Sequence, residues 1–450
     1  MSHIIPSTDR KVKGGKRLVN GKNLCYDDSM RMLREVSDVS VPNCRRSRFA
    51  CYFAYLSMAS VFVMPAMLFT TFHRLYGVSF TLLGTLVVVN FCVQMCIDLI
   101  FTFFSRWFNI RLTVRVMPLL TAVGLLVYAL VPHLAPQNAY WGLVAGTVVF
   151  SVAAGLCEVL ISPLVAAMPS EHPEKDMSLL HSLYGWGVVS VVLLSSLYFL
   201  LFGTDRWLYL ALFWAALPVV SSVLFCLADL PDLQLSSADR GQKSAGRAKG
   251  IALCLLCIFL GSSAENTMTN WISGYMEIAL GIPKEVGDML GLAVFALLLA
   301  LTRVWYARYA PNIIKTLLVS MIGATVCYLT VGLVGQVYVA FTACILTGIF
   351  TSMLWPGTLI LMEEKIPGPG VAAYALMAAG GDFGASVAPQ MMGVLVDRVA
   401  AGNWAARLSD TMGVTPEEIG MKVGMLAATV FPALGVALVL YIRRVYKKRT

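Results

Sequence analysis

The chain has 450 residues, of which 58% are hydrophobic and only 13% are charged, and its formal net charge is +9. A soluble protein usually has about a quarter of its residues charged, so this composition excludes a soluble domain and indicates a polytopic membrane protein. The Lys and Arg residues lie between apolar stretches and at the two ends, which argues against nucleic acid binding and for loops at a membrane surface.

Twelve apolar stretches are long enough to cross a bilayer, which requires about 20 residues of helix. In chain order they are expected at 49–72, 79–104, 112–132, 139–167, 179–202, 206–228, 250–279, 286–305, 312–335, 338–362, 371–396 and 422–442. The sequence therefore predicts an all-α membrane protein with twelve transmembrane helices in two pseudo-symmetric six-helix bundles.

The loop charges predict the orientation. If both ends and the alternate loops lie on one side, that side holds 28 of the 34 Lys and Arg residues, and the other side holds Arg74, Arg206, Lys284, Arg398, Arg407 and Lys422. Because cytoplasmic loops carry the excess of positive charge, we expect both termini in the cytoplasm and the protein in the plasma (inner) membrane. The expected parts are an N-terminal tail (1–48), a first bundle (49–228), a cytoplasmic linker (229–249), a second bundle (250–445) and a C-terminal tail (446–450).

The two halves share an internal repeat. The loop at 105–111 has a hydroxyl residue, an Arg and a second Arg five positions later, and the loop at 302–308 repeats this pattern 197 residues further on. Spans four and ten each carry a Gly followed eight residues later by a Pro, at Gly155 and Pro163 and at Gly348 and Pro356. Parallel six-helix repeats are typical of secondary transporters.

With these features the chain resembles the major facilitator superfamily over roughly residues 49–445. Ser105 and Thr302 stand where the loop motif of that family normally has an acid, and its glycines are missing. Three stretches are more closely similar to the fucose permease-like sugar–proton symporters: 155–163 (GLCEVLISP), 180–187 (LHSLYGWG) and 264–271 (AENTMTNW). Those symporters commonly carry an acid or Asn in span one, but 49–72 contains neither. The resemblance implies alternating-access transport of a small solute together with protons.

Four carboxylates with no Lys or Arg beside them lie inside the apolar spans, where an ionised side chain costs at least roughly 2.5–3.5 kcal/mol: Asp98, Glu158, Glu265 and Asp382. Glu158 and Asp382 lie about 16 Å into spans four and eleven, counting 1.5 Å per residue. Because burial at that depth favours the protonated carboxyl, both are candidates for proton coupling, although Asp382 could equally be a structural acid. Asp98 lies nearer the cytoplasmic end, and we expect it to form a gate contact rather than to bind substrate.

The other candidate residues are polar, charged or aromatic residues of the spans and their loops. Span seven carries Glu265, Asn266 and Asn270, whose amides and carboxylate suit sugar hydroxyls, and Trp271, whose flat ring suits stacking on a sugar. Further candidates for substrate binding are Asn90, Gln94, Tyr184 and Trp355. Candidates for gating are Arg106, His181 and Arg303.

The leading hypothesis is a proton-coupled transporter of a neutral, hydroxyl-rich solute such as a monosaccharide. It rests on acids embedded without bases, since the deepest Lys and Arg are expected in the loops and an anionic solute would require an embedded base. One alternative is an exporter of organic cations or drugs, which acids and aromatic rings also bind. Another is a non-transporting membrane sensor with the same fold.

No nucleotide-binding, metal-binding or catalytic motif is present in the sequence, so we expect no cofactor, no metal and no enzymatic activity. The expected partners are the solute, protons and the lipid bilayer, with no nucleic acid, and the chain is expected to work as a monomer.

Overall fold

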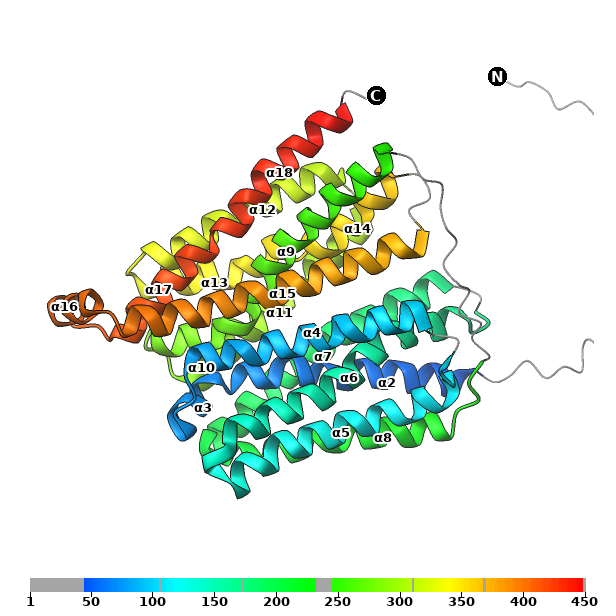
Figure 1. Cartoon of the computed structure of the whole chain (residues 1–450), viewed down its shortest axis with the longest axis horizontal. Helices are drawn as coiled ribbons and strands as arrows, with labels where there is room; N and C mark the ends of the chain where they lie inside the picture. The colour runs from blue at the N-terminus through cyan, green and yellow to red at the C-terminus, as the bar shows by residue number, and fades with distance from the viewer. Residues whose placement is uncertain are drawn as a thin grey trace, which may run out of the picture. The chain divides into compact units, whose positions relative to one another are not determined.

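The computed structural model describes residues 44–104, 107–170, 173–231, 245–309, 311–366 and 370–447. Within these ranges all regular secondary structure is helical. Eleven stretches of the described chain are long and apolar enough to cross a membrane. The remaining predicted span, span eleven, falls in α15 (Gly370–Ala400), a helix of 31 residues that contains several glycines and Asp382. Together they form the predicted fold of twelve spans in two six-helix bundles (Figure 1).

The first bundle contains spans one to six. Its helices are α2 (Arg45–Met67) and α3 (Phe69–Tyr76), α4 (Phe80–Phe104), α5 (Ile110–Leu134), α6 (Ala139–Ala166), α7 (Pro173–Phe202) and α8 (Trp207–Cys226). Span one, predicted as a single helix, is broken at Leu68, whose backbone N–H bonds to the carbonyl oxygen of Pro65, three residues back. The predicted tail at 1–48 ends in helix, because α2 already begins at Arg45.

The second bundle contains spans seven to twelve. Its helices are α9 (Ala245–Ile278), α10 (Lys284–Val286), the π-helical turn η4 (Gly287–Leu292), α11 (Ala293–Tyr309), α12 (Ile313–Leu333), α13 (Val337–Thr351), α14 (Leu354–Lys365), α15, α16 (Asn403–Met412), α17 (Pro416–Ala428) and α18 (Val430–Lys447). Spans eight, ten and twelve are therefore each built from more than one helix. Most of the predicted linker, residues 232–244, lies outside the described residues.

The internal repeat extends to the helix caps. The side chain of Asn109 accepts a hydrogen bond from the Leu112 backbone N–H at the start of α5, and that of Asn312 accepts one from Lys315 at the start of α12, both at 3.1 Å. These caps satisfy N–H groups that a helix start leaves without a partner. Spans three and nine, which are equivalent in the two halves, thus begin in the same way.

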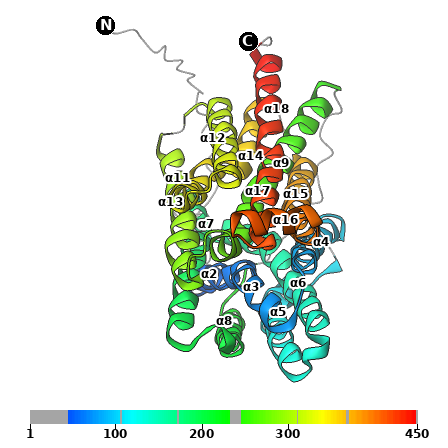
Figure 2. The same ribbon diagram turned by 90° about the vertical axis from the view of Figure 1, so that its left-hand side faces the viewer.

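The bundles meet most closely where α4 packs along α15, on the side of the molecule opposite to α7 and α11 (Figure 2). At the start of α4, the Asp397 carboxylate accepts hydrogen bonds from the backbone N–H groups of Phe80 (3.1 Å) and Thr81 (2.6 Å). Gly393 allows this approach, because a Cβ there would lie 2.3 Å from the Phe80 carbonyl oxygen. We call this end, with the start of α4 and the end of α15, the outer end, following the predicted orientation.

Asp397→Ala is expected to loosen this contact between the bundles at the outer end. Removing a carboxylate that caps a helix start costs about 0.5–2 kcal/mol, so the population with the outer end open should rise about two- to thirtyfold. Spin labels at Leu75 and Trp404, both exposed at this end, would report the separation. Asp205→Asn is the control, because Asp205 pairs with Arg74 within the first bundle. An unchanged distance distribution in Asp397→Ala would show that the cap does not hold the bundles together.

Candidate functional site

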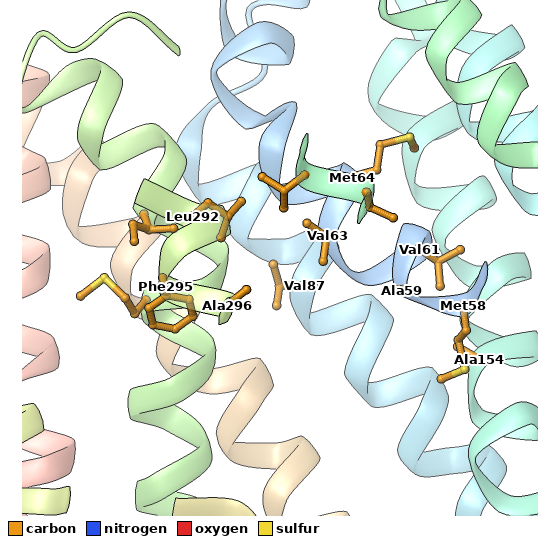
Figure 3. Packing of buried hydrophobic residues seen from close by; sticks show 14 of the residues in the cluster. Met58, Ala59, Val61, Val63, Met64, Val87, Ala154, Leu292, Phe295 and Ala296 are labelled. Carbon is orange, nitrogen blue, oxygen red and sulfur yellow. The ribbon is translucent and has the colours of Figure 1, made fainter. Parts of the chain in front are cut away.

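A cavity of about 360 Å³ lies between the two bundles. Helices α2, α4 and α7 form one wall, and α9, η4 and α11 form the other. Toward the outer end its boundary is apolar: Val63 and Val87 of the first bundle face Leu292 and Ala296 of the second (Figure 3). The cavity is of the size that proteins use for small-molecule ligands.

The polar groups of the cavity are concentrated on α9. Glu265, Asn266, Thr269 and Asn270 all line it. The Asn270 amide donates to the Asn266 carbonyl oxygen (2.9 Å), and the Thr269 hydroxyl donates to the Glu265 carbonyl oxygen (2.9 Å). The Thr269 and Asn270 side chains thus each donate one hydrogen bond to their own helix. The side-chain oxygen of each can still accept a hydrogen bond from a ligand in the cavity.

Glu265 is paired with Arg303 of α11, at 3.0 Å between carboxylate oxygen Oε1 and guanidinium Nη2. The same guanidinium donates through Nε to the carbonyl oxygen of Ser352 (2.9 Å), in the break between α13 and α14. Pro356 explains why that carbonyl is available, since it has no N–H to bond to the residue four positions earlier. Pro356 thus leaves the Ser352 carbonyl oxygen available to accept a hydrogen bond from Arg303, and Arg303 in turn forms an ion pair with Glu265.

The expectation that the deepest Lys and Arg lie in the loops is wrong. Arg303 lies within α11 and lines the cavity. Lys284 at the outer end is buried, with its ammonium 2.7 Å from the Ser273 hydroxyl and 3.4 Å from the Asp288 carboxylate. The loop motif predicts a gating role for Arg303. The motif does not show which face of a helix carries this residue, so its place on the cavity wall could not be predicted.

Trp271 does not line the cavity. Its indole is fully buried and donates to the Pro389 carbonyl oxygen (3.0 Å), and its ring lies edge-on to Phe69, with centroids 5.4 Å apart. Phe80 of α4 covers it as well, with centroids 6.0 Å apart. In this structure Trp271 packs between the bundles and away from the cavity, and its stacking on a sugar stays a prediction.

The two amide residues of span two, Asn90 and Gln94, differ in their position relative to the cavity. Asn90 lines the cavity, and its carbonyl oxygen Oδ1 accepts hydrogen bonds from the Ser151 hydroxyl (2.6 Å) and the Gln94 amide (3.0 Å). Gln94 is buried and absent from the cavity wall, because Gly155 lets α6 pack directly on its backbone. In this structure Gln94 contacts Asn90, and its predicted contact with substrate stays a prediction.

Two aromatic candidates also differ in position. Tyr184 lines the cavity, edge-on to Phe62, with ring centroids 5.9 Å apart. Trp355 is absent from the cavity wall and packs on Gly381, where a Cβ would lie 2.3 Å from its ring. Trp355 thus fills the gap beside the broken helix in this structure, and its role at the substrate stays a prediction.

Three carboxylates gather beside the cavity, from α4, α6 and α15. Asp382 lies within electrostatic reach of both Glu158 and Asp98, and Asp98 within reach of Glu158. Asp98 and Asp382 are buried, and oxygen Oδ2 of Asp382 has no hydrogen-bond partner among the described residues. Asp98, predicted as a gate residue, thus belongs with the two acids predicted to couple protons.

Two gating candidates are not placed. Arg106 lies outside the described residues, and His181 lies in α7 but its side chain is not described. Within the described chain, no group of three or more His, Cys, Asp or Glu residues could hold a metal ion.

The comparisons with known proteins agree with this architecture. The Major Facilitator Superfamily profile matches residues 43–389. A bacterial homologue of the human lysosomal transporter Spinster, solved in an inward-facing, unoccupied conformation, is 11% identical, with a TM-score of 0.72 over 90% of this chain and 98% of that one. A D-xylose–proton symporter is 13% identical (TM-score 0.60, 86% and 96% covered), and the Escherichia coli fucose:proton symporter is 14% identical (TM-score 0.51, 87% and 98% covered).

At these identities the solved structures show the fold alone, and the fucose symporter is one of several similar proteins. A comparison with curated protein sequences finds no match. Because the family profile covers most of the chain, the protein belongs to the Major Facilitator Superfamily.

Proposed function

We propose that the protein is a proton-coupled secondary transporter of a small neutral solute rich in hydroxyl groups, most simply a monosaccharide. The observation that carries this is the state of Glu265 on the cavity wall. One carboxylate oxygen is bound by Arg303, while the other, Oε2, is buried and has no hydrogen-bond partner in the described structure. A buried acceptor without a partner favours a ligand that brings a donor.

The ion pair also favours a neutral solute over an organic cation. Arg303 offsets the charge of Glu265, and the other polar groups of the wall are uncharged: Asn90, Ser182, Asn266, Thr269 and Asn270. An organic cation would have to compete with a guanidinium that is held by two acceptors. The cation-exporter alternative therefore has less support than the neutral solute.

Proton coupling is supported by the acids beside the cavity. Asp98, Glu158 and Asp382 lie within electrostatic reach of one another. Each of these carboxylates is costly to ionise inside a bilayer, so the three together are candidates to carry the coupled proton. Two of the structurally similar proteins are the D-xylose–proton symporter and the fucose:proton symporter.

We also propose a membrane location, an orientation and a monomeric state for the protein. We place the protein in the plasma membrane as a monomer, with both termini and the 229–249 linker in the cytoplasm and with bundles at 49–228 and 250–445. A membrane-impermeant thiol reagent applied to intact cells should not label a cysteine introduced at Asp239. Labelling there from outside would overturn this orientation.

The function itself is tested by uptake into vesicles. Purified protein in proteoliposomes should accumulate one member of a panel of radiolabelled monosaccharides when an inward proton gradient is imposed, and should only equilibrate it without the gradient. Transport of organic cations, with no monosaccharide transported, would favour the exporter alternative. No transport of either class would favour the sensor alternative.

Loss of single hydrogen-bonding groups on α9 should weaken binding of the transported sugar. Asn266→Ala, Asn270→Ala or Thr269→Val leaves a solute hydroxyl without its partner, which costs about 1–3 kcal/mol, or roughly 5- to 150-fold in affinity. Thr325→Val is the matched control, because its hydroxyl also bonds to the carbonyl four residues back (2.7 Å) but lies away from the cavity. Equal affinities for all four variants, by equilibrium binding, would make α9 a structural helix only.

A further inference from the structure

The cavity extends from the middle of the space between the bundles toward its edge, around α11. On this helix, Phe295, Leu299 and Arg303 line it from one face, while Leu297, Leu301 and Val304 line it from another. At 100° per residue these two sets point roughly 100–180° apart around the helix. One cavity can touch both only if it continues into the gap between α11 and its neighbour α7.

That gap is lined by apolar and small side chains. On the α7 side are Gly185 and Trp186, and on the α11 side Ala300, Leu301 and Val304; we call these five residues the α7–α11 crevice. Trp186, Leu301 and Val304 are 59%, 53% and 59% exposed. The crevice therefore reaches both the cavity and the surface that faces the acyl chains of the bilayer.

The two helices approach each other only loosely here. Opposite Gly185, a Cβ would lie 3.6 Å from the Ala300 side chain, which is ordinary contact, with no other heavy atom within 4 Å. On the opposite side of the molecule, α4 and α15 pack closely and are joined by hydrogen bonds (Figure 2). The crevice is thus the more open of these two seams between the bundles.

We propose that the solute is amphiphilic, with a hydroxylated head bound along α9 and an apolar group that occupies the α7–α11 crevice. This rests on the proposed function and deepens it: the substrate class is a glycoside-like molecule with an alkyl or aryl substituent, rather than a bare sugar. A bare sugar would place hydroxyls against the apolar wall with no partner, and that is costly. An alkyl group there buries apolar surface instead.

The test uses two series of short-chain probes, methyl to hexyl β-D-glucosides and methyl- to hexyltrimethylammonium, all below micelle-forming concentrations. Affinity, measured by calorimetry on the purified protein, should rise about fourfold per methylene in the glucoside series until the crevice is full. Ala300→Leu and Gly185→Leu, each of which fills the crevice, should remove this rise while leaving methyl glucoside affinity within twofold. Thr342→Leu, on the exposed face of α13, is the control and should leave the rise intact.

The outcomes separate the two proposals. If affinity rises with chain length only in the ammonium series, and both crevice variants lose that rise, the solute is amphiphilic but its head is not hydroxylated. Glucoside affinities that do not change with chain length would overturn the amphiphile and leave sugar transport standing. A rise that persists in both Ala300→Leu and Gly185→Leu would also overturn it, because the apolar group would then lie elsewhere.

Discussion

Glu158→Gln and Asp382→Asn are each expected to abolish accumulation driven by a proton gradient while solute exchange across the membrane continues. An amide resembles the protonated carboxyl in shape but cannot release a proton. Because Glu158 and Asp382 lie within electrostatic reach of each other, we expect either amide to interrupt the same proton step. The loss should be close to complete, since a transporter without coupling can only equilibrate its solute.

The measurement compares gradient-driven uptake with counterflow exchange in proteoliposomes. Asp205→Asn is the control, because Asp205 is an exposed carboxylate paired with Arg74 at the outer end and should keep full coupling. Asp98→Asn should shift the pH dependence of uptake, since Asp98 interacts with Glu158. Gradient-driven accumulation at the parental level in both amide variants would place the coupled proton outside this cluster.

The sequence was sufficient for the features that depend on local pattern. Apolar stretches of about 20 residues gave the spans, because a helix in lipid must satisfy its own backbone groups. The polar face of α9 could also be predicted from the sequence, since residues four apart share a face of a helix. Glu265 and Thr269 form one such pair, and Asn266 and Asn270 another, and all four line the cavity.

Features that depend on which helices meet could not be predicted in this way. Trp271 follows Asn270 directly, yet its neighbours are Phe69, Phe80 and Pro389, which come from three other helices. No periodicity within α9 indicates that a bulky ring at this place faces the other bundle. The same holds for the grouping of Asp98 with Asp382, which lie 284 positions apart in the chain.

The contacts of Arg303 could be predicted from the sequence only in part. Pro356 shows from sequence alone that the Ser352 carbonyl loses its helical donor. The donor that replaces it is 49 residues away, and only the packing of α11 beside the break in span ten reveals it. The long side chain of Arg303 then reaches Glu265, although the motif placed this arginine near a loop.

Arg303→Gln is accordingly expected to change both stability and ligand preference. The variant leaves the Glu265 carboxylate without its cation in a largely buried position. Because Arg303 is 38% exposed, the cost should lie below the 3–5 kcal/mol of a fully buried pair, at about 1–3 kcal/mol. The carboxylate should then attract cations, so affinity for a probe such as tetraethylammonium should rise at least tenfold while sugar affinity falls.

The double variant Arg303→Gln with Glu265→Gln tests the cause. Removing both charges should restore most of the thermal stability and abolish the new cation binding, since no uncompensated carboxylate remains. Lys422→Gln is the control, because it breaks the Lys422–Glu418 pair (2.7 Å) outside the cavity and should leave ligand preference unchanged. If the single variant binds tetraethylammonium no better than the parent, Glu265 does not face the solute. The neutral-solute proposal would then lose the observation that carries it.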